Sequence, residues 1–388
     1  MTTPIEQAVR AVASSDVVDL ARALCSVPAD SGAESARAEI IADVLDRDGI
    51  EVHVADVIPG RPNVIAKVKG SGVRPPLVLQ GHIDASVVQK GWERDPHEPW
   101  ESDGRLYGGG VDDMLGGVAA MVAAVEGAVR LDELPGDLVL HATMHHNGSG
   151  LGAKYALLTE GPSEGYGICG EPSDLAIHTA NGGAFKFEIV LTGTFAHVSR
   201  MESAIDTLGP AVEAYRALVD HTFEHEAEPR LPDLPRLSIG QLDAGRGPAT
   251  IADTAVIRGD IRYVPGMNRS TVCKEIEEVV TSVVPSEVGH RTRIIGLHQP
   301  FLGVTSGPLV DALADAHSAI LGRTPRVTSE LPGQAYVTDA ADLAEAGLDT
   351  VVYGVGDWHA GPNSWVGIEE LVASARVYLA VAATLTSN

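Results

Sequence analysis

The sequence predicts an α/β domain that is interrupted by a smaller, inserted α+β domain. Two apolar runs, residues 76–84 and 137–144, indicate buried strands, and the alanine-rich segment between them, residues 114–131, indicates a buried helix. At about residue 184 the pattern changes to strict alternation of apolar and polar residues, and the α/β pattern resumes from about residue 297. The second domain is therefore expected to be inserted into the first.

The remaining elements of the first domain follow from the same periodicities. Before the insertion we expect amphipathic helices at 5–25 and 34–48, a strand pair at 51–57 and 63–70, and a helix near 151–160. After it we expect helices at 307–321, 338–346 and 367–386 and strands at 326–329 and 350–356. The expected division is 1–183 and 297–388 for the first domain and 184–296 for the second.

The inserted segment has its own order of elements. A strand at 184–193 precedes a helix at 203–221, strands near 236–242 and 254–264, and a helix at 268–282. This β-α-β-β-α-β order predicts a small ferredoxin-like α+β domain.

Composition and charge exclude several classes of function. The 388 residues carry a formal charge of −25, from 28 basic and 53 acidic residues, and such a surface repels nucleic acids and anionic membranes. The start, MTTPIEQAVRAV, does not resemble a secretory signal, and no apolar run is long enough to span a membrane. The three cysteines are widely spaced, so we expect a cytoplasmic protein with free thiols.

Four groups of polar residues follow expected strands of the first domain, where open α/β sheets place ligands. They are Gly81-His82-Ile83-Asp84, the turn 108–117 with Asp112 and Asp113, Gly170-Glu171-Pro172-Ser173, and the loop 356–363 with His359. Histidine and carboxylate side chains are ligands for metals, and Asp84 can fix the tautomer of His82. Taken singly, each group also has a structural interpretation, as a helix cap, a turn or an ordinary loop.

The order of the motifs resembles that of one enzyme family. The motifs are GHID (81–84), WERDPHEP (92–99), LYGGGVDDMLGGVAA (106–120), GEPS (170–173), GTFAHVS (193–199), GDIR (259–262), TDAADLAEAG (338–347) and GDWHAGPN (356–363). Together they resemble the acetylornithine deacetylase, succinyl-diaminopimelate desuccinylase, aminoacylase and carboxypeptidase G family of zinc metallopeptidases. The resemblance covers nearly the whole chain. It implies a zinc-peptidase-like catalytic domain with an inserted lid and dimerisation domain.

The resemblance also implies roles for individual residues. His82, Asp113 and Glu171 would hold one zinc ion, and Asp113 would bridge to a second ion that His359 also binds. Asp84 would orient His82, and His197 of the inserted domain would stabilise the developing oxyanion in the partner subunit of a homodimer. Arg262 would bind a substrate carboxylate, and Gly333 and Thr338 are further candidates for contact with the substrate.

The sequence departs from the family at the catalytic base. The family has Asp-Glu-Glu after the fourth core strand, where this chain has His145-His146-Asn147. Counted without gaps, the base becomes His146 and the second metal ligand becomes Asn147; a one-residue gap would give His145 and His146 instead. Asparagine is a weak, neutral ligand, so the second metal should bind less tightly unless a histidine takes its place. His146 could act as a base near neutral pH.

Three functions are consistent with these residues. The first is a metal-dependent amide hydrolase acting on an N-acyl amino acid, a small peptide or a related amide. The second is a non-hydrolytic enzyme (a lyase, a cyclase or an acyl transferase) that uses the same metal site with His146 as acid and base. The third is a binding homologue without catalysis. One or two zinc ions are expected, with cobalt or manganese as possible substitutes, together with a small-molecule substrate.

Overall fold

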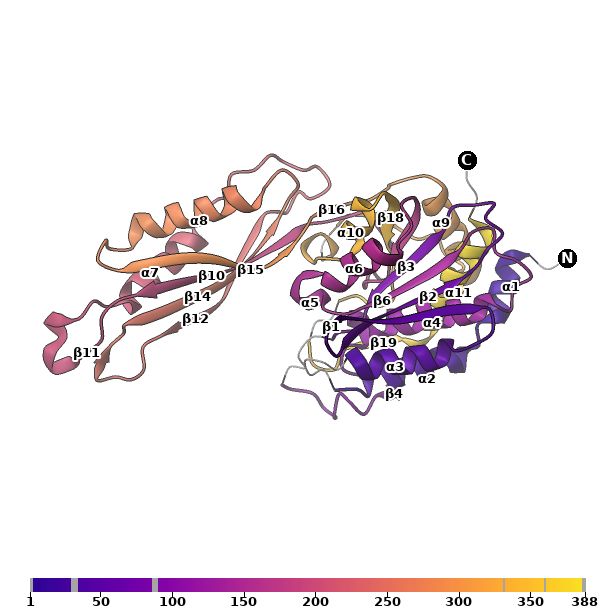
Figure 1. Ribbon diagram of the computed structural model, residues 1–388, viewed down its shortest axis with the longest axis horizontal. Coiled ribbons are helices and arrows are strands. Elements are labelled where there is room, and N and C mark those ends of the chain that lie inside the picture. Colours follow the sequence, from indigo (N-terminus) through magenta and orange to yellow (C-terminus); the bar gives the residue numbers. More distant parts are fainter. Residues whose placement is uncertain (1–2, 29–33, 86–89, 331, 359–360, 386–388) are drawn as a thin grey trace. The chain divides into compact units, whose positions relative to one another are not determined.

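The computed structural model describes residues 3–28, 34–85, 90–330, 332–358 and 361–385 (Figure 1). The chain divides into two compact units. The first comprises Met1–Ala180, Phe301–Ser329 and Thr338–Asn388, and the second comprises Asn181–Pro300 and Glu330–Val337. The chain therefore leaves the first unit twice, and the alternation of the sequence does not indicate the second, shorter excursion.

An eight-stranded sheet forms the centre of the first unit, in the order β1-β2-β6-β3-β7-β18-β8-β17. The strands are β1 (Ile50–Ile58), β2 (Arg61–Val68), β3 (Leu77–His82), β6 (Leu138–Thr143), β7 (Gly165–Cys169), β8 (Ile177–His178), β17 (Val327–Thr328) and β18 (Leu348–Val352). The four neighbours β6, β3, β7 and β18 run parallel. Their carboxyl ends therefore meet along one edge of the sheet, and this edge positions the site described below.

Both faces of this sheet are buried. On β3, Leu77 and Leu79 belong to one apolar cluster and Val78 belongs to another, because successive side chains of a strand point to opposite faces. The first cluster contains residues of α1 (Pro4–Ala11), α2 (Ser14–Cys25), α3 (Glu34–Leu45), α4 (Gly116–Ala128), α9 (Pro308–Leu321) and α11 (Ile368–Thr384), and the second contains residues of α6 (Leu151–Glu160) and α10 (Ala340–Glu345). Helices on both faces give the α/β layering that the sequence predicted.

Shorter elements complete the chain. They are β4 (Trp100–Ser102), β5 (Arg105–Tyr107), η1 (Val111–Leu115), α5 (His146–Ser149), β9 (Ala180–Asn181), β16 (Phe301–Leu302), η3 (Gly333–Ala335) and β19 (Trp365–Gly367). Within the described part of the chain, no helix has both the length and the apolar character that crossing a membrane requires.

The helix expected over residues 5–25 is two helices, and this prediction was wrong. Val12 (φ −106°, ψ 110°) and Ala13 (φ −80°, ψ 138°) are extended and separate α1 from α2. The break lets α1 pack on α11 while α2 packs on α4. Because the apolar periodicity continues through both helices, it does not reveal the break.

The second unit is built on a four-stranded antiparallel sheet in the order β12-β14-β10-β15. Its elements are β10 (Gly183–Thr192), β11 (Ala196–His197), η2 (Val198–Ser203), α7 (Leu208–Val219), β12 (Arg236–Ala244), β13 (Thr250–Ile251), β14 (Thr254–Tyr263), α8 (Arg269–Val283) and β15 (Gly289–His298). Phe185, Phe187, Ile189 and Leu191 alternate along β10 and are buried. The predicted fold class, an α/β domain with an α+β domain of β-α-β-β-α-β order, is confirmed.

Candidate metal centre

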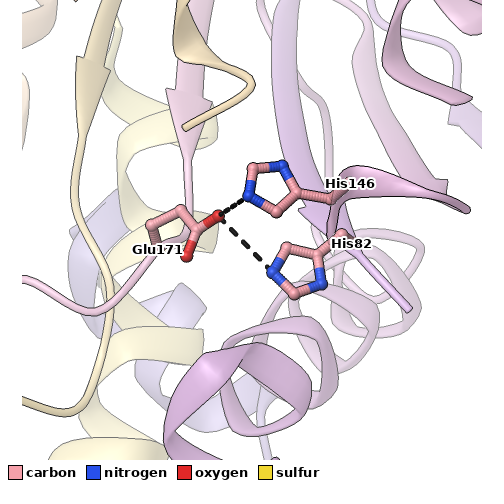
Figure 2. A group of neighbouring side chains, drawn as sticks. All are labelled: His82, His146 and Glu171. Atoms are coloured by element: carbon pink, nitrogen blue, oxygen red, sulfur yellow. Dashed lines mark ion pairs between the residues drawn. The ribbon is translucent and has the colours of Figure 1, made fainter. Parts of the chain in front are cut away.

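Three neighbouring strands end in side chains that meet at one point. His82 is the last residue of β3, His146 follows β6 at the start of α5, and Glu171 follows β7. The two imidazole rings are stacked, with their centroids 4.5 Å apart and their planes inclined by 6°. Nε2 of each ring lies 3.5 Å from the same oxygen, Oε1 of Glu171 (Figure 2).

The outer nitrogen of each histidine has an oxygen acceptor. Nδ1 of His82 lies 2.7 Å from the backbone carbonyl of Asp84, and Nδ1 of His146 lies 2.7 Å from Oδ1 of Asp339. Each Nδ1–H donates to its acceptor, so Nε2 is the nitrogen that each ring would present to a metal. A hydrogen bond from the outer nitrogen is typical of histidines that bind metals.

The carboxylate of Asp113, in the turn before α4, approaches His82. Asp113 lies in η1, and its Oδ1 is 3.1 Å from Nε2 of His82. Bonds of about 2.0–2.1 Å to a tetrahedral zinc ion would place ligand atoms about 3.3 Å apart. The two separations of 3.5 Å between Oε1 of Glu171 and the histidine nitrogens are close to this spacing, and Asp113 lies next to that group, at His82.

The environment of Glu171 supports a cation site. Its side chain is 1% exposed, and among the described residues neither carboxylate oxygen accepts a hydrogen bond. A buried carboxylate without a donor is costly, whereas a cation would satisfy it. The residues present therefore fit a metal ion.

Burial and neighbouring charges both shift the pKa values of the cluster. Burial raises the pKa of Glu171 to about 7, against the opposing effect of the two histidines. Burial by itself lowers the pKa of His146, but the neighbouring carboxylates of Asp339 and Glu171 outweigh it and raise that pKa to about 9. The carboxylates that favour a proton on His146 would equally favour a cation, which would displace that proton.

Asp84 differs from its predicted role in one respect. The sequence predicted that its carboxylate orients His82, but the backbone carbonyl of Asp84 accepts that hydrogen bond. The carboxylate instead accepts the backbone N–H groups of His146 and Asn147, each at 2.9 Å. Asp84 therefore fixes the start of α5, and through it the position of His146.

Asn147 and His145 lie on either side of His146. Asn147 donates its side-chain amide to Oδ2 of Asp84 at 3.1 Å. His145 has a left-handed backbone (φ 63°), and its Nδ1 lies 3.3 Å from Oγ of Ser149. Of the three residues, the described geometry brings only the ring of His146 against Glu171. His359, the remaining predicted ligand, lies outside the described residues.

The predicted substrate contacts belong mostly to the second unit. His197 is exposed on β11, and its Nδ1 accepts the N–H of Ser199 at 3.2 Å. Nε of Arg262 lies 2.9 Å from Oδ1 of Asp260, so its guanidinium is already paired with a carboxylate. Gly333 lies in η3, whereas Thr338 is buried in the first unit beside Asp339.

Sequence reasoning missed Asp339 and Gln80. Asp339 is 2% exposed, and it accepts from His146 and, through Oδ2, from Nε2 of Gln80 at 3.2 Å. Asp339 belongs to the TDAADLAEAG motif (338–347), and Gln80 belongs to the apolar run that ends near His82. An acid directly before a helix is ordinarily interpreted as a cap, so only the approach of two distant segments reveals the contact.

The chain is similar to known amide hydrolases. The family model described as Peptidase family M20/M25/M40 matches residues 78–384. N-formyl-4-amino-5-aminomethyl-2-methylpyrimidine deformylase of Bacillus subtilis (strain 168) is 29% identical over 374 residues, which cover 87% of this chain and 86% of that protein. Succinyl-diaminopimelate desuccinylase of Gluconobacter oxydans (strain 621H) is 29% identical over 345 residues, which cover 85% of this chain and 87% of that protein.

Solved structures agree on the fold. The di-peptidase Dug1p from Saccharomyces cerevisiae superposes with a TM-score of 0.82 at 15% sequence identity, covering 99% of both chains. The predicted reaction class, hydrolysis of an amide bond by a metallohydrolase, is confirmed, and nothing in these comparisons favours the non-hydrolytic or the non-catalytic alternative. The chain belongs to peptidase family M20/M25/M40, as its motifs predicted.

Proposed function

We propose that this enzyme uses zinc to hydrolyse the amide bond of a small N-acylated compound, such as an N-acyl amino acid or a short peptide. The observation that carries the proposal is the meeting of His82, His146 and Glu171 around one point, with the buried carboxylate of Glu171 lacking a hydrogen-bond donor among the described residues. The relatives' deformylase and desuccinylase activities, which release a small acyl group from an amine, support this class of substrate.

Each residue of the centre has a distinct part. Glu171 and Asp113 supply negative charge, and His82 supplies a nitrogen whose direction the Asp84 carbonyl fixes. A bound zinc ion supplies Lewis acidity toward the amide carbonyl and lowers the pKa of water. Because His82 and Glu171 are each 1% exposed, the centre is shielded from bulk water and charges within it interact strongly.

The second unit would contribute the substrate contacts. We assign the substrate's carboxylate to Arg262, which would have to exchange its ion pair with Asp260 for the substrate. A neutral or differently charged substrate would leave that ion pair intact. Variation of the charge on the amine portion of test substrates therefore examines the role of Arg262 directly.

The proposal is tested with protein purified without chelator. We expect at least one equivalent of zinc per chain by mass spectrometry, and release of free amine from a panel of N-formyl, N-acetyl and N-succinyl compounds. Glu171→Gln should lose both zinc and hydrolysis. Glu126→Gln is the matched control, because Glu126 is an equally buried carboxylate, on α4, that is paired with Arg47 and Arg130. Zinc uptake without hydrolysis of any amide in the panel would contradict the proposed substrate class.

We also propose a cytoplasmic homodimer that forms through the second unit, with His197 serving the partner's site. Apolar side chains in and before α7 are exposed, among them Phe195 (51%), Met201 (53%) and Val219 (53%). A second copy would cover such a surface. Free cysteines, two of them buried, fit a reducing compartment. Light scattering of the wild type and of Met201→Glu should give the mass of a dimer and of a monomer, respectively.

A further inference from the structure

We propose that His146 is a metal ligand and not a general base, and that Asp339 is the carboxylate that holds it in the ligand orientation. This assignment rests on the proposed metal-dependent function and extends it. It differs from the family's arrangement, in which the equivalent position carries the catalytic glutamate. The assignment follows from the similarity between His146 and His82.

The two histidines have the same environment at both ring nitrogens. Nε2 of each faces Oε1 of Glu171 at 3.5 Å, and Nδ1 of each donates to an oxygen at 2.7 Å. The rings are stacked, so both present the same edge to Glu171 (Figure 2). If His82 binds the metal, His146 offers a second nitrogen of the same kind to the same point.

Asp339 is itself held in place. It is 2% exposed, and its second oxygen accepts from Nε2 of Gln80, which also donates to Oγ1 of Thr143 at 2.8 Å. Gln80 lies on β3, two residues before His82, and Thr143 lies at the end of β6. The carboxylate is therefore fixed by the strands that precede the two histidines. It holds the proton of His146 on Nδ1 and directs Nε2 toward Glu171.

A base at this position needs a free nitrogen that faces the attacking water. Nε2 of His146 instead faces Glu171, and the ring covers His82. A histidine paired with a buried carboxylate also occurs in general bases. The two roles differ in one measurable way, because a ligand contributes to metal affinity and a base does not.

The experiment measures zinc affinity by competition with a chromophoric chelator, and the number of imidazole ligands by X-ray absorption at one zinc equivalent. We expect His146→Ala to lower the affinity at least 100-fold and to remove one imidazole from the zinc. His145→Asn is the matched control, because His145 is adjacent and asparagine tolerates its left-handed backbone. The control should keep the wild-type affinity and imidazole count.

Variants of Asp339 test the positioning role. Asp339→Ala should lower zinc affinity 10–100-fold, the usual effect of removing a carboxylate behind a metal-binding histidine. Asp339→Asn keeps an oxygen acceptor for Nδ1–H and should restore most of the affinity. Thermal unfolding of the metal-free variants, followed by tryptophan fluorescence, shows that each has folded.

One result would overturn the assignment. If His146→Ala binds zinc with wild-type affinity and keeps the wild-type imidazole count but loses hydrolysis, His146 is a base. Because affinity is measured without substrate, the result is independent of the proposed reaction. A wild type that binds zinc through two imidazoles but hydrolyses no amide would refute the hydrolase and leave the ligand assignment standing.

Discussion

Arg37 ties the metal-binding loop to the helices beneath it, and its removal should cost much of the stability of the first unit. Its side chain lies on α3 and is 1% exposed. The guanidinium donates to three backbone carbonyls: Leu24 at 3.1 Å, Ile83 at 2.9 Å and Val27 at 2.7 Å. Ile83 stands between His82 and Asp84, so one of these bonds positions the loop that carries the proposed ligand His82.

The magnitude follows from the carbonyls that would remain. In Arg37→Met the apolar stem is kept and all three hydrogen bonds are lost. Ile83 is fully buried, so water cannot replace the donor there, and its unpaired carbonyl costs about 1–3 kcal/mol. The carbonyl of Leu24 keeps a bond from the N–H of Val27 at 3.4 Å, and that of Val27 is partly accessible, so each adds less. We expect a loss of about 3 kcal/mol, against a total of about 5–15 kcal/mol for a typical domain.

A competing effect has the opposite sign. Burying the guanidinium costs desolvation energy, and replacing a buried ion pair by apolar groups is often neutral or stabilising. That result requires both partners to be replaced. Here the partners are backbone carbonyls, which no substitution removes, so the loss of the hydrogen bonds should dominate. Arg37→Lys keeps the charge but has a single ammonium group, and we expect it to lose about 2 kcal/mol.

The assay is equilibrium unfolding in urea, followed by tryptophan fluorescence on chelator-treated protein. The four tryptophans, Trp92, Trp100, Trp358 and Trp365, all belong to the first unit, so the signal reports that unit alone. Arg22→Met is the control, because Arg22 makes a partly exposed ion pair with Glu101 and a single hydrogen bond to the carbonyl of Pro99, whose loss should cost about 1 kcal/mol. A free energy of unfolding for Arg37→Met within 1 kcal/mol of the wild type would refute this reasoning.

Three further predictions use the same fluorescence signal. Gly117→Ala would place its Cβ 2.7 Å from the carbonyl oxygen of Gly170, the residue before Glu171. It should lower the free energy of unfolding by about 1–3 kcal/mol and weaken zinc binding. The control is Gly127→Ala on the same helix, whose Cβ meets its nearest atom at 3.1 Å and should cost less. Burial, followed by the charge of Asp339, raises the pKa of Asp342 to about 7. The stability that depends on its neutral form is therefore lost as the pH rises from about 4 through 7. In urea unfolding, the free energy of unfolding of Asp342→Asn should exceed that of the wild type by about 3 kcal/mol at pH 8 and match it near pH 3. Zinc removal should lower the urea midpoint of the first unit, because zinc binds the folded site. The unfolding transition of the second unit, followed by far-ultraviolet circular dichroism, should not change. Equal midpoints of the first unit with and without zinc would contradict binding at this centre.

The site residues that could be predicted are those that lie at the carboxyl end of a strand. His82 and Glu171 each follow an apolar run, and such runs are buried strands whose carboxyl ends meet. The local pattern therefore determines both the element and the place of the ligand. The order of the motifs along the chain then indicated the family, which local patterning cannot supply.

The parts that could not be predicted depend on contacts between distant segments. Asp339 stands 193 positions from His146 in the chain, and nothing near either residue indicates the hydrogen bond between them. The choice between two registers for His145-His146-Asn147 was equally hidden, since both place histidines after β6. In space the two histidines differ, because the ring of His145 lies beside Ser149 and the ring of His146 lies beside Glu171.

The charges around the centre argue for one tightly bound zinc and a weaker second one. His82 and His146 are neutral as ligands, and Asp113 and Glu171 together carry two negative charges, which balance one dication. A second ion would share Asp113 and would meet the neutral Asn147, whose amide nitrogen already donates to Asp84. It would therefore bind with little further compensation of charge. Titration of metal-free protein with zinc should show a first equivalent bound at least 100-fold more tightly than the second. Two equivalents of equal affinity would mean that Asn147 has not weakened the site, and that the lost carboxylate is replaced by a ligand from elsewhere in the chain.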